Sequence, residues 1–168
     1  MNRIAEFDKV TFKTFKKDWE ERFGVAPLNL KEIYDEIEYP RRATKGSAGY
    51  DFFSPINFAL LAGQSVVIPT GIRCKIDEGY MLQIFPRSGL GFKYRLQLAN
   101  TVGIIDSDYF FADNEGHILI KLVNATKENR IVEIKKGQGF AQGIFIPYGI
   151  TVDDNAETLR FSGFGSTD

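Results

Sequence analysis

The sequence is poor in the residue types on which many catalytic and metal sites depend. Its 168 residues contain one cysteine, Cys74, and one histidine, His117. A single cysteine cannot form a disulfide within the chain, which favours a reducing, cytosolic location. A single histidine excludes metal sites that need several histidines, and any Ser-His-Asp or Cys-His scheme would depend on it. We expect His117 to be an ordinary strand residue and assign it no function.

The sequence also lacks a membrane segment, a secretion signal and a basic excess. No apolar run approaches the roughly 20 residues of a membrane-spanning helix. The first residues, MNRIAEFDKVTFK, lack the charged-then-apolar order of a secretory signal. With 21 Lys and Arg against 22 Asp and Glu, the formal net charge is −1, which argues against bulk nucleic-acid binding. We therefore expect a cytoplasmic protein without a membrane anchor or stable nucleic-acid binding.

Residues 1–46 differ in pattern from the rest of the chain. Alternation predicts a short strand at 8–15, and helical periodicity predicts an insertion with helices at 17–23 and 28–37. In the second of these helices the apolar residues recur at i, i+3, i+4 and i+7, a face that we expect to pack on the core. Hydrophobic residues make up 43% of the chain, which is enough to form a core.

From residue 47 onward the sequence consists of short apolar segments separated by Gly, Asp, Asn or Pro. We expect eight strands, at 57–62, 65–69, 72–76, 80–85, 93–98, 117–123, 131–134 and 140–147. This spacing predicts an all-β domain over 47–159, built as a sandwich, barrel or jelly roll. A Gly- and Ser-rich arm over 160–168 follows, and we expect it to be flexible when no ligand is bound.

Two segments carry residues suited to phosphate chemistry, although the P-loop and the GxGxxG motif are absent. In the first, Arg87 offers a fork of donors to phosphate oxygens, Ser88 adds a hydroxyl, and Gly89 lets backbone N–H groups approach an anion. In the second, Asp106 precedes Tyr109 and could align and deprotonate a water molecule. Taken singly, an ordinary polar turn and a turn-forming Asp pair explain these segments better.

Three further segments are weaker. Asp51 could hold a metal-bound water or cap a turn, and Gln142 could donate to a phosphate or satisfy a strand edge. The C-terminal tail could wrap a triphosphate, with Phe164 stacking on a base, or be a disordered terminus.

Taken together and in order, five segments resemble the five motifs of the trimeric dUTP nucleotidohydrolases, or dUTPases. They are AGYDFFS, PRSGL, GIIDSDY, KGQGFAQ and RFSGFGST, and the resemblance spans residues 47–167. It implies a single-domain β jelly roll of the β-clip type and a homotrimer whose active sites are shared between subunits. It also implies Mg²⁺-dependent hydrolysis of dUTP to dUMP and pyrophosphate by attack of water on the α-phosphate. Such an enzyme keeps uracil out of DNA and supplies dUMP.

The resemblance implies a role for each matching residue. Asp106 would activate the water, and Tyr109 would pack under the deoxyribose and exclude a 2′-hydroxyl. Asn100 would stand at the base of a hairpin whose backbone reads uracil, and unpaired buried polar groups would then reject cytosine. Asp51 would lie near the water shell of Mg²⁺. The phosphate contacts would come from Arg87, Ser88, Gly89 and Gln142, and the closing arm would contribute Arg160, Phe164, Gly165, Ser166 and Thr167.

Phosphoryl transfer depends on positioning and charge neutralisation more than on covalent help from the protein, so one histidine and one cysteine are no obstacle to this chemistry.

The sequence departs from the family pattern at four places. Phe110-Phe111 replaces a basic residue and a glycine, and Gly139 replaces an arginine. Arg160 lies one residue closer to Phe164 than is usual, and Asp168 replaces a small residue.

Two other functions remain open on the sequence alone. A dCTP deaminase would share the fold and the trimer, but it needs a carboxylate near the pyrimidine C4, and segment 98–108 contains no clear candidate glutamate. A dUTP-gated regulatory protein would bind a partner through the inserted residues 17–37. An intact Asp106 argues against a purely non-catalytic protein.

Overall fold

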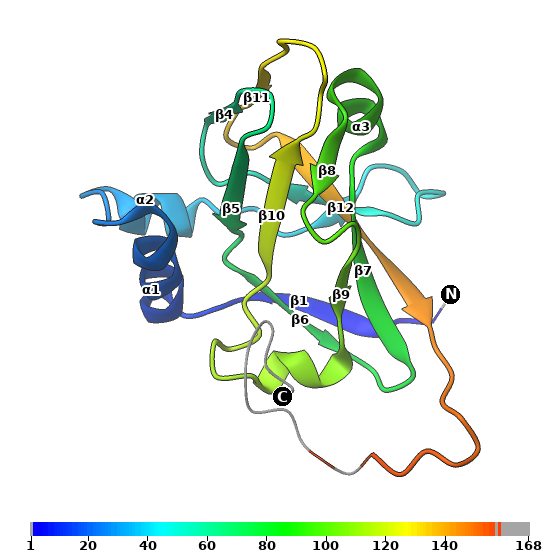
Figure 1. Ribbon diagram of the computed structural model, residues 1–168. Helices are drawn as coiled ribbons and strands as arrows, with labels where there is room; N and C mark the ends of the chain where they lie inside the picture. The colour runs from blue at the N-terminus through cyan, green and yellow to red at the C-terminus, as the bar shows by residue number, and fades with distance from the viewer. Residues whose placement is uncertain (1, 157, 159–168) are drawn as a thin grey trace.

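Antiparallel strands make up most of this computed structural model, which describes residues 2–156 and 158 (Figure 1). The strands are β1 (Ala5–Lys9), β2 (Arg41–Arg42), β3 (Tyr50–Phe53), β4 (Phe58–Leu60), β5 (Ser65–Pro69), β6 (Ile72–Ile76), β7 (Tyr80–Pro86), β8 (Leu96–Leu98), β9 (Gly103–Ile105), β10 (Leu119–Asn124), β11 (Val132–Ile134) and β12 (Gly139–Pro147). The helices are α1 (Phe12–Phe23), α2 (Leu30–Asp35), α3 (Ser88–Tyr94) and the 3₁₀ helix η1 (Ser107–Phe111). The all-β class expected from the sequence is confirmed.

The described strands form four sheets, and β12 is the central strand of the largest. That sheet has the order β2-β3-β12-β7-β9, a second has the order β5-β10-β8, and β1-β6 and β11-β4 are two-stranded. Buried residues alternate with exposed or half-buried ones along β10 and β11, as expected of strands with one face on a core. The largest fully buried side chains of the core include Phe15, Phe52 and Phe140.

The N-terminal region corrects one prediction. The strand predicted at 8–15 is wrong, because β1 ends at Lys9 and α1 begins at Phe12. The alternation of apolar and polar residues runs on into α1, where Phe12, Phe15 and Trp19 have the spacing of one helix face. Over so few residues, the period of a strand and the period of a helix cannot be told apart. The Thr11 side chain caps the helix by accepting from the backbone N–H of Thr14 at 3.3 Å.

The segment before β8 corrects a second prediction. We expected a strand over 93–98, but residues 88–94 form α3 and the strand begins only at Leu96. Arg95 separates the two with a left-handed backbone (φ 54°), which ends the helix. The other seven expected strands are present with ends shifted by at most two residues. Strands β3 and β9 were missed because they lie inside the motif segments and are short.

Helices α1 and α2 lie together beside β5, at one side of the sheets (Figure 1). Phe15 and Trp19 of α1 and Leu30 of α2 are buried in the same core as the strands. The apolar face expected of the second helix therefore packs inward, as predicted. No helix among residues 2–156 and 158 has the length and apolar character needed to cross a membrane. The arm predicted at 160–168 lies outside the described residues.

Candidate active site

Three of the five motif segments meet at one end of the largest sheet. Gln142 of β12 is paired in register with Asp51 of β3 on one side and with Phe85 of β7 on the other. Arg87 follows directly after β7 and is the cap residue of α3. The antiparallel register of the three strands thus gathers Asp51, Arg87 and Gln142, which we call the phosphate cluster together with Ser88 and Gly89.

An ion pair orients the arginine of the phosphate cluster. The Arg87 Nε lies 3.1 Å from the Asp51 Oδ1, and the Arg87 Nη1 donates to the Gly139 carbonyl at 3.3 Å. The Asp51 side chain is 15% exposed, whereas that of Arg87 is 41% exposed. Gln142 donates from Nε2 to the Pro86 carbonyl at 3.4 Å. The guanidinium is therefore held on one side by a largely buried carboxylate while much of it still faces solvent, as an anion-binding arginine requires.

Gly139 and Gly49 lack the side chains that would otherwise fill the space occupied by Arg87 and Gln142. A Cβ on Gly139 would lie 2.8 Å from the Arg87 Nη1, and one on Gly49 would lie 2.6 Å from the Gln142 Oε1. Real Cβ atoms do not approach other atoms so closely, so a larger residue would displace either side chain. The glycine found where the family motif has an arginine thus coincides with the space filled by Arg87.

Ser88 and Gly89 lie at the start of a helix and not in an open turn. They are the first two residues of α3, and both are exposed beside Arg87. The sequence predicts a turn here, because the helical pattern of residues 88–94 is short and contains two glycines.

The remaining described motif lies at the other end of β7. Asp106 follows β9 and precedes η1, where it is half-buried, and Tyr109 within η1 is only 3% exposed. The Tyr109 hydroxyl donates to the His117 carbonyl at 2.8 Å and accepts from the Asn114 Nδ2 at 2.8 Å. The buried Tyr109 side chain is therefore held in place at its hydroxyl, and its backbone N–H donates to the Asp106 carbonyl at 3.2 Å. Asp106 lies beyond the end of β9, since the strand ends at Ile105.

Asn100 lies in the loop between β8 and β9, which pair with β10 and β7 respectively, so the two strands do not form the hairpin that the resemblance implies. The turn is tight, because the Val102 N–H donates to the Asn100 carbonyl at 2.7 Å and Thr101 has a left-handed backbone (φ 67°). A largely apolar cavity of about 340 Å³ opens beside this loop, lined by Asn100, Gly103, Ile84 of β7 and residues of β10. A larger hollow of about 980 Å³ lies beside Tyr50 and Phe145 and contains none of the predicted site residues.

One copy of the chain does not bring Asp106 and Arg87 together. Strand β7 pairs with β9 so that Leu82 faces Ile105 and Ile84 faces Gly103. Asp106 therefore lies near the level of Met81, whereas Arg87 follows the far end of β7. At about 3.3 Å per residue, the two ends of this strand are separated by roughly 15–20 Å.

Arg73 of β6 also lies beside η1, although no sequence motif includes it. Its guanidinium lies 3.5 Å from the centre of the Phe110 ring and donates from Nη2 to the Phe110 carbonyl at 2.8 Å. The Arg73 guanidinium of β6 thus lies next to Phe110-Phe111, where the family motif has a basic residue and a glycine. No local pattern pointed to Arg73, because the contact joins residues 37 apart in sequence.

The arrangement of these segments agrees with comparisons against known proteins. The family model described as dUTPase matches residues 35–167. The chain belongs to the dUTPase family. A deoxyuridine 5′-triphosphate nucleotidohydrolase of Lactococcus lactis is 39% identical over 134 residues, 78% of this chain and 88% of that protein. A protein of the same name from Chlamydia pneumoniae is 41% identical over 138 residues, 77% of this chain and 90% of that protein.

Solved dUTPase structures have the same fold. The dUTPase of Streptococcus mutans matches with a TM-score of 0.62 at 31% identity, covering 86% of this chain and 97% of that chain. The dUTPase of Staphylococcus aureus phage phi11 matches with a TM-score of 0.63 at 20% identity, covering 94% of this chain and 98% of that chain. At this level of identity the match is evidence for the fold alone. The jelly roll implied by the sequence resemblance is confirmed. Helix α1 lies outside the residues that match the dUTPase family model.

Proposed function

We propose that this protein hydrolyses dUTP to dUMP and pyrophosphate by attack of water on the α-phosphate. The observation that carries the proposal is the pair formed by Asp106 and Tyr109, a half-buried carboxylate three residues before a fixed, buried aromatic ring, in a chain of the dUTPase family. Asp106 orients the water and accepts its proton, and preorganised groups around the phosphates carry the charge that develops.

In this proposal the nucleoside is bound beside Asp106 and Tyr109. Tyr109 forms the floor under the deoxyribose, where a 2′-hydroxyl would meet a ring that cannot move. The loop at Asn100 reads the uracil edge through backbone groups, which would be left unpaired against cytosine. The cavity of about 340 Å³ beside this loop falls in the size range of small-molecule pockets.

The triphosphate is bound by the phosphate cluster. Arg87 supplies a charged fork of donors, Ser88 a hydroxyl, and Gln142 an amide, while Gly89 keeps the approach open. The C-terminal residues that complete the site in this proposal are Arg160, Phe164, Gly165, Ser166 and Thr167, which lie outside the described residues.

Mg²⁺ is the proposed cofactor, and it would neutralise charge on the triphosphate when bound. A phage phi11 dUTPase mutant is described with coordination of a structural Mg(II) ion. Within residues 2–156 and 158, no three His, Cys, Asp or Glu side chains gather as a metal cage. The carboxylate in the phosphate cluster is Asp51, already paired with Arg87. One such carboxylate fits an ion that keeps several waters and binds mainly through substrate phosphates.

The active protein is proposed to be a homotrimer with shared active sites. Arg87 and Asp106 lie at opposite ends of β7, so one copy cannot present both to a single triphosphate. A second copy that places its Asp106 beside the first copy's phosphate cluster completes the site, and closed rotational symmetry repeats this contact. A cytoplasmic location fits a nucleotide-metabolising enzyme of this kind.

A pyrophosphate-release assay with Mg²⁺ and dUTP, dCTP, dTTP or UTP tests the proposed function. We expect turnover of dUTP and at least 100-fold lower kcat/KM for the other three, since each meets an unpaired polar group or a steric clash. Equal turnover of all four nucleotides would contradict the proposal. Ammonia release from dCTP would select the deaminase instead.

A further inference from the structure

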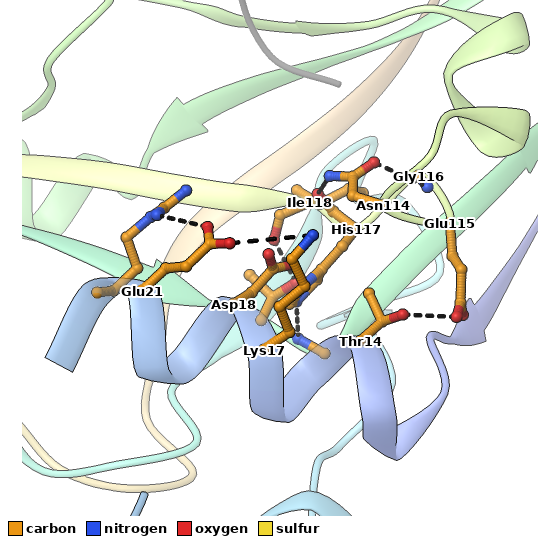
Figure 2. Close-up of polar contacts among 12 residues, drawn as sticks. Thr14, Lys17, Asp18, Glu21, Asn114, Glu115, Gly116, His117 and Ile118 are labelled. Carbon is orange, nitrogen blue, oxygen red and sulfur yellow. Dashed lines mark hydrogen bonds and ion pairs between the residues drawn. The ribbon is translucent and has the colours of Figure 1, made fainter. Parts of the chain in front are cut away.

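The chain's only histidine links helix α1 to the segment that follows η1. His117 is fully buried, its Nδ1 lies 2.5 Å from the Asp18 Oδ2, and its Nε2 accepts from the Gly71 N–H at 2.8 Å (Figure 2). Because an amide can only donate, Nε2 is the acceptor, and the ring proton sits on Nδ1 facing Asp18. Asp18, in the middle of α1, is itself only 5% exposed. The contact is therefore a buried, directional hydrogen bond between two distant parts of the chain.

A second contact ties the start of α1 to the same segment. Glu115 accepts from the Thr11 N–H at 2.7 Å and from the hydroxyls of Thr11 and Thr14 at 2.6 Å. Burial alone would raise the pKa of Glu115, but these hydrogen bonds and the nearby Arg73 hold it below its usual value. Figure 2 shows Glu115 and His117 reaching the helix at Thr14 and Asp18 respectively.

The anchored segment holds Tyr109. The His117 carbonyl accepts the Tyr109 hydroxyl proton, and Asn114 donates to the same hydroxyl. Gly116 packs so tightly against η1 that a Cβ there would lie 2.7 Å from the Tyr109 carbonyl oxygen. Residues 114–117 thus contact α1 on one side and Tyr109 on the other, and they are tightly packed between the two.

We propose that α1 positions Tyr109, with Asp18, His117 and Glu115 as positioning residues that set the height of the deoxyribose floor. The proposal rests on the proposed function and extends it to a helix outside the residues that match the dUTPase family model. Loss of the Asp18–His117 contact frees the backbone at 117, which lets the tyrosine ring retreat. The site then admits a 2′-hydroxyl, so the predicted effect is on sugar discrimination as well as on rate.

The test compares Asp18→Leu with Asp18→Asn, using pyrophosphate release from dUTP and from UTP. The leucine variant removes the acceptor for the His117 Nδ1–H, whereas the asparagine variant keeps an amide oxygen there. For Asp18→Leu we expect the ratio of kcat/KM for UTP to that for dUTP to rise about tenfold or more, with KM for dUTP affected more than kcat. For Asp18→Asn we expect that ratio to stay within about twofold of the unmodified protein.

A stability-matched control separates positioning from a general loss of structure. Ile134→Ala empties a buried site in β11, away from α1, and should lower the unfolding temperature without changing the UTP-to-dUTP ratio. An unchanged ratio in folded Asp18→Leu, or an equal change in Ile134→Ala, would overturn the inference. If Asp18→Leu does not fold, Thr14→Val, which removes one hydroxyl contact to Glu115, carries the same test. Failure of the unmodified protein to hydrolyse dUTP would instead overturn the proposed function.

Discussion

The Asp51 carboxylate lies 3.1 Å from the Nε of Arg87, and this ion pair sets the direction in which the guanidinium points. Asp51 comes from β3 and Arg87 from the end of β7, and β12 holds the two strands on either side of itself. An ion pair whose arginine is 41% exposed contributes little to stability. Its value here is orientation, because the arginine is presented to solvent at a fixed place beside Gln142.

Replacement of Gly139 by alanine should displace Arg87. The new Cβ would overlap the Arg87 Nη1, and the flexible side chain can move away more easily than the backbone. We expect KM for dUTP to rise about tenfold, the size of one charged hydrogen bond, with kcat and unfolding temperature nearly unchanged. Gly149→Ala, at a site with nothing within 4 Å, serves as the control. A KM equal to that of the unmodified protein would show that Arg87 does not contact substrate.

Asp106→Asn should abolish turnover while the protein still binds dUTP. The amide cannot accept the proton of the attacking water, so pyrophosphate release should fall at least about 100-fold. Calorimetry with dUTP should give a dissociation constant within a few-fold of that of the unmodified protein. The exposed Asp113→Asn, just after η1, is the matched control and should keep full activity. Substantial turnover by Asp106→Asn would assign the base to another residue.

Mixed trimers should recover activity from two inactive subunits. If each site takes Arg87 from one copy and Asp106 from another, every trimer that contains both Arg87→Gln and Asp106→Asn chains has about one site in three intact. Co-expression with two different tags, purification over both, and a pyrophosphate assay would measure this recovery. Sites formed within single chains would give no recovery at all, because every chain then lacks one of the two groups.

Acid should destabilise the protein partly through Glu115. Its pKa is lowered in the folded state, so its contribution is present above the pKa of the unfolded chain and is lost as the pH falls through the folded value. Unfolding temperatures between about pH 7 and pH 3 should therefore fall more steeply for the unmodified protein than for Glu115→Gln. The exposed Glu133→Gln, on β11, should follow the unmodified protein. Parallel curves for Glu115→Gln and the unmodified protein would contradict the assignment.

Local sequence patterns were sufficient for much of the fold. Strands 65–69 and 72–76 were predicted with the bounds that the structure has, because their apolar segments end at clear turn residues. The five motif segments were recognised in order, and family membership followed from them. The strand at 8–15 was wrong, since alternation over a few residues also fits the start of a helix.

The amino-acid sequence by itself determined the fold class, the family and the residue types available for phosphate chemistry. Only the tertiary structure decided which of those residues meet. It joined Asp18 to a buried His117 across 99 positions, and it placed Arg87 and Asp106 at opposite ends of β7. The physical reason is that periodicity and motifs report on neighbours along the chain. Contacts between distant residues depend on strand register and on the packing of buried side chains.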